Sequence, residues 1–318
     1  MNIVILDGYT LNPGDLSWAP FEALGNLTVY ERTPVEEVLE RSKDAEIVLT
    51  NKTKVLSETI KALTKLQYIG ELATGYDNID VKEAANRNIP VCNVPGYSTA
   101  SVAQLTWSLI LELVYKTGER SADVHKGAWA KSKDFCFGHM GLFELQGKTL
   151  GLVGLGQIAT AVANIGLAFG MKVIASVRNP KKYNIAGIDF VSRNECFQQA
   201  DIISLHCPLT DDTRQMVNAD VLKTMKAGSF IINTARGALI KEQDLADALN
   251  KGQIAGAALD VLSAEPPPAS NPLFGAKNCI ITPHIAWATK EARERLLNES
   301  AKNIQAFFNG KPRNVVNS

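Results

Sequence analysis

Apolar residues in this chain follow two alternating patterns, short continuous runs and longer stretches with helical spacing. In the first third, continuous runs at 2–7, 27–31, 47–51, 66–73 and 89–94 predict strands, and the amphipathic stretches at 34–44, 57–65 and 80–88 predict helices. Continuous apolar strands that alternate with helices are typical of a parallel sheet covered on both faces. We therefore place one such unit at residues 1–98.

A second and longer series of the same kind follows a helical stretch at 101–118, for which Ser101 is the expected N-cap. A further amphipathic stretch at 290–310 comes after this series, and its return to the first unit would make that unit discontinuous. The strands predicted in the second series are 150–155, 172–177, 201–208, 229–235, 254–262 and 279–285, and two of the helices between them are 159–170 and 241–252.

The turn after the first strand of the second series is rich in glycine. Gly154, Gly156 and Ala159 fit the pattern G-x-G-x-x-G/A between a strand and a helix. In this context the first glycine makes the tight turn, the second lets a pyrophosphate approach the backbone, and the small third residue lets the helix pack on the strand. Free N–H groups and the helix dipole favour the anion there. The pattern therefore predicts a dinucleotide-binding unit.

The strand that follows lacks the acidic residue that usually ends it in NAD-binding units. An Asp or Glu at this point hydrogen-bonds the adenosine ribose, but here the strand ends Ser176-Val177-Arg178 and the next acid is Asp189. The guanidinium of Arg178 can pair with a phosphate through two hydrogen bonds. The sequence therefore favours NADP(H) over NAD(H). The alternative is that Arg178 is a solvated loop residue and the backbone holds the ribose.

Composition narrows the class of protein without identifying it. A hydrophobic content of 46% and a charged content of 21% are ordinary for a globular protein. The formal net charge is zero, which gives no electrostatic reason to expect nucleic acid or an anionic membrane as a partner. The longest apolar stretch, 105–115, is too short to span a bilayer, and no basic leader precedes the first strand.

The five cysteines are scattered and form no C-x-x-C pair. In a chain of this size they indicate reduced thiols, so we expect a cytoplasmic protein. Cys136 and His139 have C-x-x-H spacing, but without a further ligand pair we expect no metal site. His125 and His139 are expected at the surface or at an interface.

Three motifs in the last third carry a family resemblance. They are NTARG at 233–237, DVLSAEP at 260–266 and TPHIAWAT at 282–289. In this order and spacing the chain resembles the D-isomer-specific 2-hydroxyacid dehydrogenase family over essentially its whole length. ATGYDNID at 73–80 and DFCF at 134–137 are similar to its glycerate dehydrogenases, also called hydroxypyruvate reductases.

The resemblance implies an α/β fold of two doubly wound parallel-sheet domains. A Rossmann-type cofactor domain at 99–286 would be inserted in a flavodoxin-like substrate domain formed by 1–98 and 287–318. The substrate would lie between the two domains. The family is commonly dimeric through its cofactor domain, so we also expect a homodimer, with the aromatic loop at 129–143 as interface material.

The same resemblance assigns the catalytic roles. Reduction of a 2-keto acid needs a hydride from the nicotinamide and a proton for the developing alkoxide, and His284 would supply this proton. Glu265 would be the carboxylate partner that favours the protonated imidazole and fixes its tautomer. Arg236 would bind the substrate carboxylate and keto oxygen and stabilise the developing negative charge.

The remaining site residues follow from matching family motifs. Substrate contacts are expected from Arg236, His284, Trp287 and the backbone N–H groups of Ala73, Thr74 and Gly75. Asp260 would hold the nicotinamide carboxamide. The predicted cofactor contacts are Gly154, Gly156, Gln157, Ile158, Ser176, Arg178, His206, Cys207, Pro208, Thr213, Thr234, Ala235, Arg236, Asp260, His284 and Ala286.

The activity that the resemblance implies is reduction of hydroxypyruvate, and of glyoxylate, to the D-2-hydroxy acid. Within the class the alternative is a reductase of broad 2-keto acid specificity. Formate dehydrogenases share the fold, but they have Gln where Glu265 stands. From a different class, a non-enzymatic NAD(P)-sensing binding module could keep all three catalytic residues, and the motifs leave this alternative open.

Overall fold

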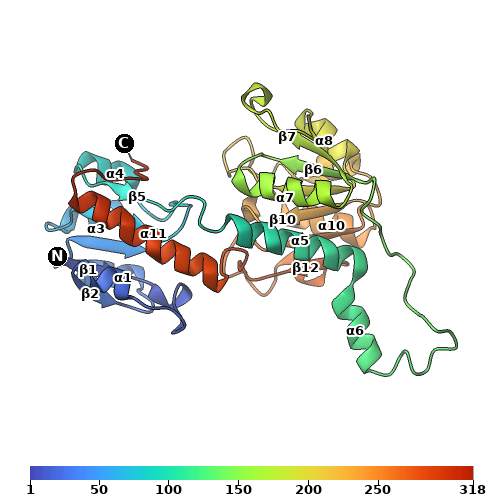
Figure 1. Ribbon diagram of the computed structural model, residues 1–318, viewed down its shortest axis with the longest axis horizontal. Coiled ribbons are helices and arrows are strands. Elements are labelled where there is room, and N and C mark those ends of the chain that lie inside the picture. Colours follow the sequence, from blue (N-terminus) through green and yellow to red (C-terminus); the bar gives the residue numbers. More distant parts are fainter. Residues whose placement is uncertain (318) are drawn as a thin grey trace. The chain divides into compact units, whose positions relative to one another are not determined.

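Buried parallel strands alternate with helices along the whole chain in the computed structural model, which describes residues 1–317 (Figure 1). Met1–Ser98 and the segment that begins at Trp287 form one unit, and Thr99–Ala286 forms the other. Each unit contains a single sheet, and every pair of neighbouring strands runs parallel. The predicted α/β class with two parallel sheets is confirmed.

The sheet of the first unit has the strand order β2-β1-β3-β4-β5, which is the flavodoxin-like order. The strands are β1 (Asn2–Ile5), β2 (Asn26–Val29), β3 (Ile47–Thr50), β4 (Tyr68–Glu71) and β5 (Val91–Cys92). The helices are α1 (Ala19–Glu22), α2 (Val38–Ser42), α3 (Ser57–Ala62), α4 (Val81–Asn86) and α11 (Lys290–Phe308).

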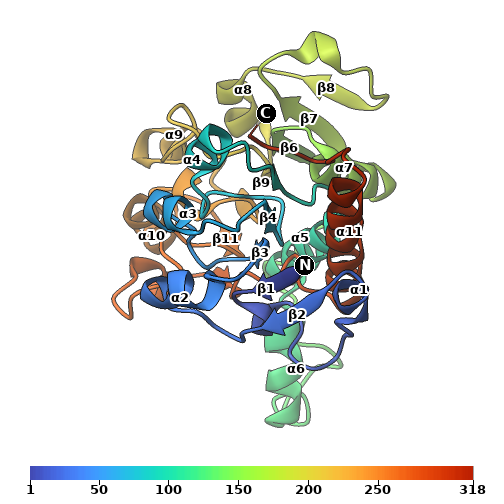
Figure 2. The same ribbon diagram turned by 90° about the vertical axis from the view of Figure 1, so that its left-hand side faces the viewer.

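Alternation along each strand explains the layers of this unit. Ile3 and Ile5 pack in one apolar cluster with Phe21 of α1 and Leu296 of α11. Val4, between them in the sequence, packs in a second cluster with residues of α2, α3 and α4. Successive strand side chains point to opposite faces, so the sheet needs helices on both sides. Figure 2 shows α11 on one side of this sheet and α2, α3 and α4 on the other.

The second unit has the strand order β12-β11-β10-β9-β6-β7-β8, which contains the Rossmann order of a doubly wound sheet. The strands are β6 (Thr149–Val153), β7 (Lys172–Ser176), β8 (Ile188–Phe190), β9 (Ile202–Leu205), β10 (Phe230–Asn233), β11 (Gly256–Leu259) and β12 (Cys279–Ile281). The helices are α5 (Thr99–Tyr115), α6 (Thr117–His125), α7 (Gln157–Ala168), α8 (Arg193–Gln199), α9 (Ala219–Thr224) and α10 (Glu242–Asn250).

Two apolar clusters again cover the two faces of this sheet. Trp107 of α5 and Val162 of α7 pack with Leu150 and Leu152 of β6. Residues of α8, α9 and α10 pack with Ile203 of β9 on the opposite face. The crossing helices thus bury the faces of the strands and leave the carboxyl ends of the strands available for a site.

The structure corrects the expected start of the long helix. This helix begins at Thr99, so Ser101 lies within its first turn and is not the N-cap. The Ser101 side chain is buried and its hydroxyl donates a hydrogen bond to the carbonyl of Ala286. The helix also ends before 118, because Lys116 adopts a left-handed backbone with φ 51° and α6 starts after it.

The strand β8 was not expected from the sequence. It has only three residues, and Asp189 in its centre is exposed and interrupts the apolar run. A run this short and mixed gives no periodic signal. None of the helices in the described part of the chain is long and apolar enough to cross a membrane.

Glu71 ends β4 with its carboxyl group buried in the first unit. The residue is 1% exposed, and neither carboxyl oxygen has a hydrogen-bond partner among the described residues. Burial raises the pKa of Glu71 from 4.5 to about 9. The nearby side chain of Asn78 and then Lys52 lower this pKa by smaller amounts, and Asp7 and Asp77 raise it further. The carboxyl group is therefore neutral in the folded protein at pH 7.

The raised pKa of Glu71 predicts that the stability of the protein depends on pH and that Glu71→Gln removes this dependence. The carboxyl group has a pKa of 4.5 in the unfolded chain and of about 9 in the folded protein. The stability that the neutral group contributes is therefore fully present below pH 4.5 and is lost as the pH rises to 9. Each pH unit in this window costs about 1.4 kcal/mol of unfolding free energy. We expect the thermal midpoint of Glu71→Gln to exceed that of wild type by a margin that grows from pH 5 to pH 9.

Glu58→Gln, at an exposed carboxylate in α3, is the matched control and should leave the midpoint at every pH within the error of wild type. A constant difference between Glu71→Gln and wild type across this pH range would show that the buried carboxyl group does not titrate as described.

Candidate active site

The glycine turn after β6 brings two loops together and leaves one stretch of backbone open. Gly154 has a φ of 94°, and a Cβ there would lie 2.8 Å from the backbone nitrogen of Cys207. Only glycine therefore permits this approach to the loop after β9. A Cβ on Gly156 would meet nothing within 4 Å, and Gly156 is the N-cap of α7. The helix N-terminus is thus accessible to an anion such as a pyrophosphate.

His206 follows β9 and belongs to the wall beside this turn. Its Nε2 lies 2.8 Å from the hydroxyl oxygen of Ser204, which is fully buried. Burial lowers the pKa of His206 to about 4. This imidazole is therefore neutral near pH 7 and cannot serve as the proton donor in that range.

The Asn233–Gly237 motif forms a rigid turn after β10. The Asn233 side chain is completely buried; its Oδ1 accepts a hydrogen bond from the N–H of Ala235 at 3.0 Å, and its Nδ2 donates to the carbonyl of Arg236 at 2.9 Å. A Cβ on Gly237 would lie 1.9 Å from the carbonyl carbon of Leu262. Glycine is therefore required for this loop to touch the loop after β11, and the contact brings the half-buried Arg236 beside the segment that carries Glu265.

Asp260 holds the next segment of the site. It follows β11, is 1% exposed, and accepts three hydrogen bonds. Its Oδ1 accepts from the hydroxyl of Thr282 at 2.6 Å and the N–H of Ile285 at 2.9 Å, and its Oδ2 accepts from the N–H of Ala286 at 2.8 Å. One buried carboxylate thus closes the loop after β12, which carries His284. Hydrogen bonds of this kind, to a charged acceptor, are among the stronger ones in proteins.

His284 and Glu265 meet at the centre of this arrangement. His284 Nδ1 lies 2.6 Å from Glu265 Oε2, and the side chains are 29% and 36% exposed. Glu265 Oε1 accepts a hydrogen bond from the N–H of Leu262 at 3.0 Å, which fixes the carboxylate. Because the carboxylate is the acceptor, Nδ1 carries the hydrogen and Nε2 is left to exchange a proton with a ligand.

His284 also has an unusual backbone. Its φ is 54°, in the left-handed region that non-glycine residues seldom adopt, and its N–H donates to the carbonyls of Asp260 at 2.8 Å and Thr282 at 3.0 Å. The three bonds that Asp260 accepts hold the chain on either side of this residue. Strained backbone of this kind is concentrated at functional sites.

The other predicted cofactor residues of the second unit line the same carboxyl edge of its sheet. Ser176 is the last residue of β7 and is half-buried, whereas Arg178 is exposed. The hydroxyl of Thr213 donates to the carbonyl of Pro208 at 2.8 Å and so shapes the loop after β9. The hydroxyl of Thr234 lies 3.1 Å from that of Thr106 in α5.

The predicted substrate-binding segment at 73–75 and Trp287 belong to the first unit. Val94 donates to the carbonyl of Ala73 at 2.9 Å, and the hydroxyl of Thr74 donates to the carbonyl of Val94 at 2.9 Å. Asn93 Nδ2 donates to the carbonyl of Thr74 at 2.7 Å. Trp287 packs against the apolar cluster between the sheet and α11. None of these hydrogen bonds uses a backbone N–H group of residues 73–75.

Some residues that build the site were not expected from the sequence. Asn233 and Thr282 lie inside the motifs, yet their roles in holding the loops in place follow only from the hydrogen bonds. The available signal was the polar residue that directly follows the apolar residues of a strand in each motif, since a polar group at such a position needs a hydrogen-bond partner. His125 and His139 are exposed. The described residues contain no group of three or more His, Cys, Asp or Glu arranged to hold a metal ion.

Comparison with known proteins gives a consistent set of relatives. Residues 107–286 match the family model for the NAD binding domain of D-isomer specific 2-hydroxyacid dehydrogenases. A hydroxypyruvate reductase from Blautia hydrogenotrophica is 48% identical over 322 residues, covering 100% of both chains. A glycerate dehydrogenase from Methylorubrum extorquens is 39% identical over 290 residues, covering 90% of each chain.

Among solved structures, the chain is similar to an acyclic imino acid reductase in complex with NADPH and D-Arg. The TM-score is 0.88 at 34% sequence identity, and the match covers 99% of this chain and 100% of that one. Together with the family match over more than half of the chain, these likenesses extend over both units. The chain therefore belongs to the D-isomer-specific 2-hydroxyacid dehydrogenase family.

Proposed function

We propose that this protein reduces a small 2-keto acid, hydroxypyruvate and also glyoxylate, to the D-2-hydroxy acid with NAD(P)H. The observation that carries the proposal is the His284–Glu265 pair at 2.6 Å, on the same sheet edge as an open glycine turn. A dinucleotide turn alone serves many functions, whereas an imidazole fixed by a carboxylate is a proton donor and acceptor. The relative named hydroxypyruvate reductase, which is 48% identical, supports the choice of substrate.

A dinucleotide fits the residues of the second unit. The N-terminus of α7 is uncovered at Gly156, so its N–H groups can bind a pyrophosphate. Cys207 and Pro208 would line the groove beside the turn, and Thr234 and Ala235 its further wall. When bound, the nicotinamide supplies a hydride to the keto carbon; the residues of the chain orient the substrate and move the proton.

His284 transfers the proton in the proposed mechanism. As negative charge develops on the keto oxygen, Nε2 of His284 donates its proton there. Glu265 stabilises the imidazolium before the transfer and keeps Nδ1–H directed away from the substrate. Oxidation of the hydroxy acid uses the same pair in reverse, with neutral His284 as the base.

Arg236 is the proposed anchor for the substrate carboxylate and keto oxygen. Its backbone is fixed by Asn233, and its Nη1 donates to the carbonyl of Ala235 at 2.9 Å. A preorganised guanidinium stabilises the developing alkoxide without reorganising in the reaction. We assign the first unit to substrate binding, with the N–H groups of Ala73, Thr74 and Gly75 as further donors and Trp287 as a pocket wall.

Asp260 acts on the reaction through His284 in addition to its proposed contact with the nicotinamide carboxamide. Its three hydrogen bonds to the 282–286 loop set the position of the imidazole. Each carboxylate oxygen can accept more than one bond, so a carboxamide N–H can be added to this set. The remaining proposed cofactor contacts, Gln157, Ile158, Thr213 and Ala286, all lie in the second unit.

For the cofactor we propose a preference for NADPH over NADH. No acid follows Ser176, and the exposed Arg178 replaces it at the strand end. The NADPH complex of the imino acid reductase, 34% identical, is consistent with this preference in a relative. The five cysteines are free, as in a reducing compartment, and a cytoplasmic location is part of the proposal.

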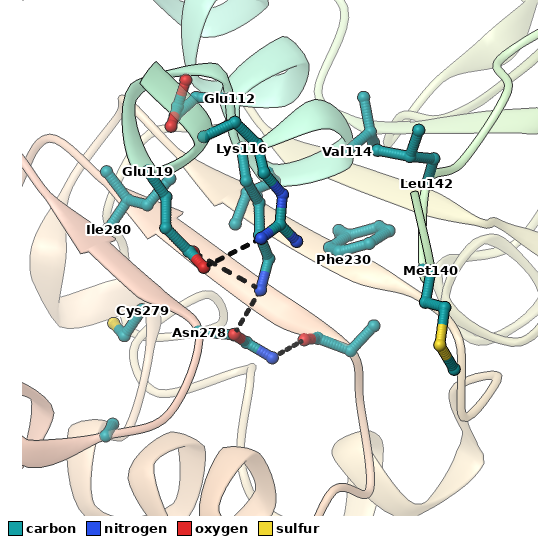
Figure 3. A pocket seen from close by; sticks show the side chains of 15 residues that line it. Glu112, Val114, Lys116, Glu119, Met140, Leu142, Phe230, Asn278, Cys279 and Ile280 are labelled. Carbon is teal, nitrogen blue, oxygen red and sulfur yellow. Dashed lines mark hydrogen bonds and ion pairs between the residues drawn. The ribbon is translucent and has the colours of Figure 1, made fainter. Parts of the chain in front are cut away.

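We further propose that the protein is a homodimer formed through the second unit. Phe135 and Met140, in the loop between α6 and β6, are 89% and 84% exposed, and Trp129 is 53% exposed. Met140 also lines a cavity of about 460 Å³ between α5, this loop and β12. Figure 3 shows Lys116, Glu119 and Asn278 on one side of this cavity and Met140 and Leu142 on the other. Large apolar side chains in such number mark an interface.

A binding module without turnover is the second candidate. The hydrogen bonds of the site would be the same in a protein that binds NAD(P)H but catalyses no reaction. It predicts binding of NAD(P)H without reduction of any 2-keto acid. Initial rates with hydroxypyruvate, glyoxylate and pyruvate, each with NADPH and NADH, separate the two. We expect the highest kcat/KM for hydroxypyruvate with NADPH. Equal rates for the three acids would favour a broad-specificity reductase, and no turnover with either cofactor would favour the module.

His284→Ala tests the proton transfer. We expect kcat with hydroxypyruvate to fall by roughly 10²–10⁴-fold, the usual contribution of a general acid. The Kd for NADPH, measured by fluorescence titration, should stay within about twofold of wild type because the glycine turn is untouched. His125→Ala, at an exposed histidine of α6, is the control and should keep full kcat. If His284→Ala retains the wild-type rate, the assigned role is wrong.

Phe135→Asp tests the homodimer. Mass from light scattering at micromolar concentration should correspond to two chains for wild type and to one chain for this variant, because a carboxylate cannot be buried unpaired in an apolar interface. Leu39→Asp, at a 43% exposed leucine of α2, is the matched control and should remain dimeric. A wild-type mass of one chain would contradict the proposal.

A further inference from the structure

Arg193 is the first residue of α8, just after the carboxyl end of β8, and Arg178 follows the carboxyl end of the neighbouring strand β7. The strands β7 and β8 are adjacent and parallel, with Ala175 opposite Phe190. The N–H of Val191 donates to the carbonyl of Ala175 at 3.0 Å, so the register continues to the strand ends. Arg178 and Arg193 each come three residues after the paired positions. Both arginines therefore follow the carboxyl ends of two neighbouring parallel strands.

The partner of Arg193 is a carboxylate on a third loop of this edge. Its Nη1 lies 3.0 Å from Asp212 Oδ2 and its Nη2 lies 3.5 Å from Oδ1. Asp212 belongs to the loop after β9, which Thr213 shapes by its bond to Pro208. The side chains of Arg193 and Asp212 are 39% and 73% exposed. A pair this exposed contributes little to stability, so Arg193 can exchange Asp212 for another anion at small cost.

The charges of Arg178, Arg193 and Asp212 all affect the thiol of Cys207. Burial raises the pKa of Cys207 to about 11; among the smaller effects, Arg193 and Arg178 lower it and Asp212 raises it. All three charged groups are thus within electrostatic reach of the thiol. Cys207 in turn adjoins the glycine turn, because a Cβ on Gly154 would lie 2.8 Å from its backbone nitrogen. The two arginines are therefore near the loop that adjoins the glycine turn.

We infer that Arg178 and Arg193 together bind the 2′-phosphate of the adenosine ribose, with Asp212 holding Arg193 in place until the phosphate arrives. The inference deepens the proposed preference for NADPH and rests on it. A phosphate monoester carries more charge than a carboxylate and presents three acceptor oxygens, so it can bind both guanidinium groups bidentately. Lys181 and Lys182, which follow Arg178, add positive charge to the same edge.

A merely structural role for Arg193 makes a different prediction. If its bond to Asp212 only orders the loop after β9, then loss of Arg193 weakens NADH and NADPH equally. It then also has the same effect as Asp212→Asn, which breaks the pair from the other side. A phosphate-binding role affects NADPH alone, and Asp212→Asn keeps the NADPH affinity or raises it because Arg193 is released.

The experiment measures Kd by fluorescence titration for NADPH and NADH and by calorimetry for 2′,5′-ADP and 5′-AMP. These two nucleotides differ only in the 2′-phosphate, and neither requires turnover. We expect Arg193→Gln to raise the Kd for NADPH and for 2′,5′-ADP about tenfold, the loss of one charge-assisted contact, and the ratio of NADPH to NADH affinity to fall by the same factor. Arg193→Lys keeps the charge but not the paired donors of the guanidinium group, so its Kd for NADPH should lie between those of wild type and Arg193→Gln.

Lys172→Gln is the matched control, since Lys172 is an exposed cation at the amino end of β7, on the opposite edge of the sheet. It should leave every Kd unchanged. If wild type binds 2′,5′-ADP no more tightly than 5′-AMP, the NADPH preference fails and the inference fails with it. If wild type does discriminate but Arg193→Gln keeps the wild-type ratio, or weakens NADH as much as NADPH, the inference alone is overturned.

Discussion

The buried carboxylate of Asp260 is the interaction on which the candidate site depends. The carboxylate is buried away from water and accepts hydrogen bonds from three donors of one loop. These charge-assisted hydrogen bonds offset the free energy that its desolvation costs. The backbone N–H of Asp260 donates to the carbonyl of Asn233, so Asp260 also links the loop of His284 to the turn that contains Arg236. Removing this one charge would release the loop of His284 and weaken its link to the turn that carries Arg236.

Two glycines make the close approach of the loops possible. Gly154 lets the turn after β6 touch the loop of His206 and Cys207, and Gly237 lets the turn of Arg236 touch the loop of Leu262. In both places any side chain would collide with backbone, which cannot yield as a flexible side chain can. The sheet fixes where the loops begin, and these glycines fix how near the loops come. Function at this edge is therefore built from loops held by a rigid scaffold.

Much of the fold could be predicted from the sequence because both sheets are parallel and covered. Strands buried on both faces give continuous apolar runs, and the crossing helices give a clear helical period. What failed was local: the three-residue β8, the start of the helix at Thr99, and its end at Lys116 with a left-handed φ. A short strand has no period to detect, and a backbone angle is invisible in hydropathy.

The motifs of the candidate site could be recognised in the sequence, but the hydrogen bonds that join them could not. The order of Arg236, Glu265 and His284 carried the resemblance, yet nothing in the sequence indicated that Asp260 binds the loop of His284 or that Arg193 pairs with Asp212. Such contacts join residues far apart in sequence, and their partners are set by the crossing of strands. The register of β7 and β8 is one example, since it relates Arg178 to Arg193 only once the sheet order is known.

The hydroxyl of Ser101 has a mechanical consequence. The chain passes between the units twice, after Ser98 and after Ala286, and Ser101 hydrogen-bonds the carbonyl of Ala286. The two connecting segments are therefore hydrogen-bonded to each other within the second unit. The N–H of Ala286 is held by Asp260, the same carboxylate that anchors the loop of His284 two residues earlier. A displacement of the backbone at Ala286 would therefore be passed through Asp260 to the loop that carries His284.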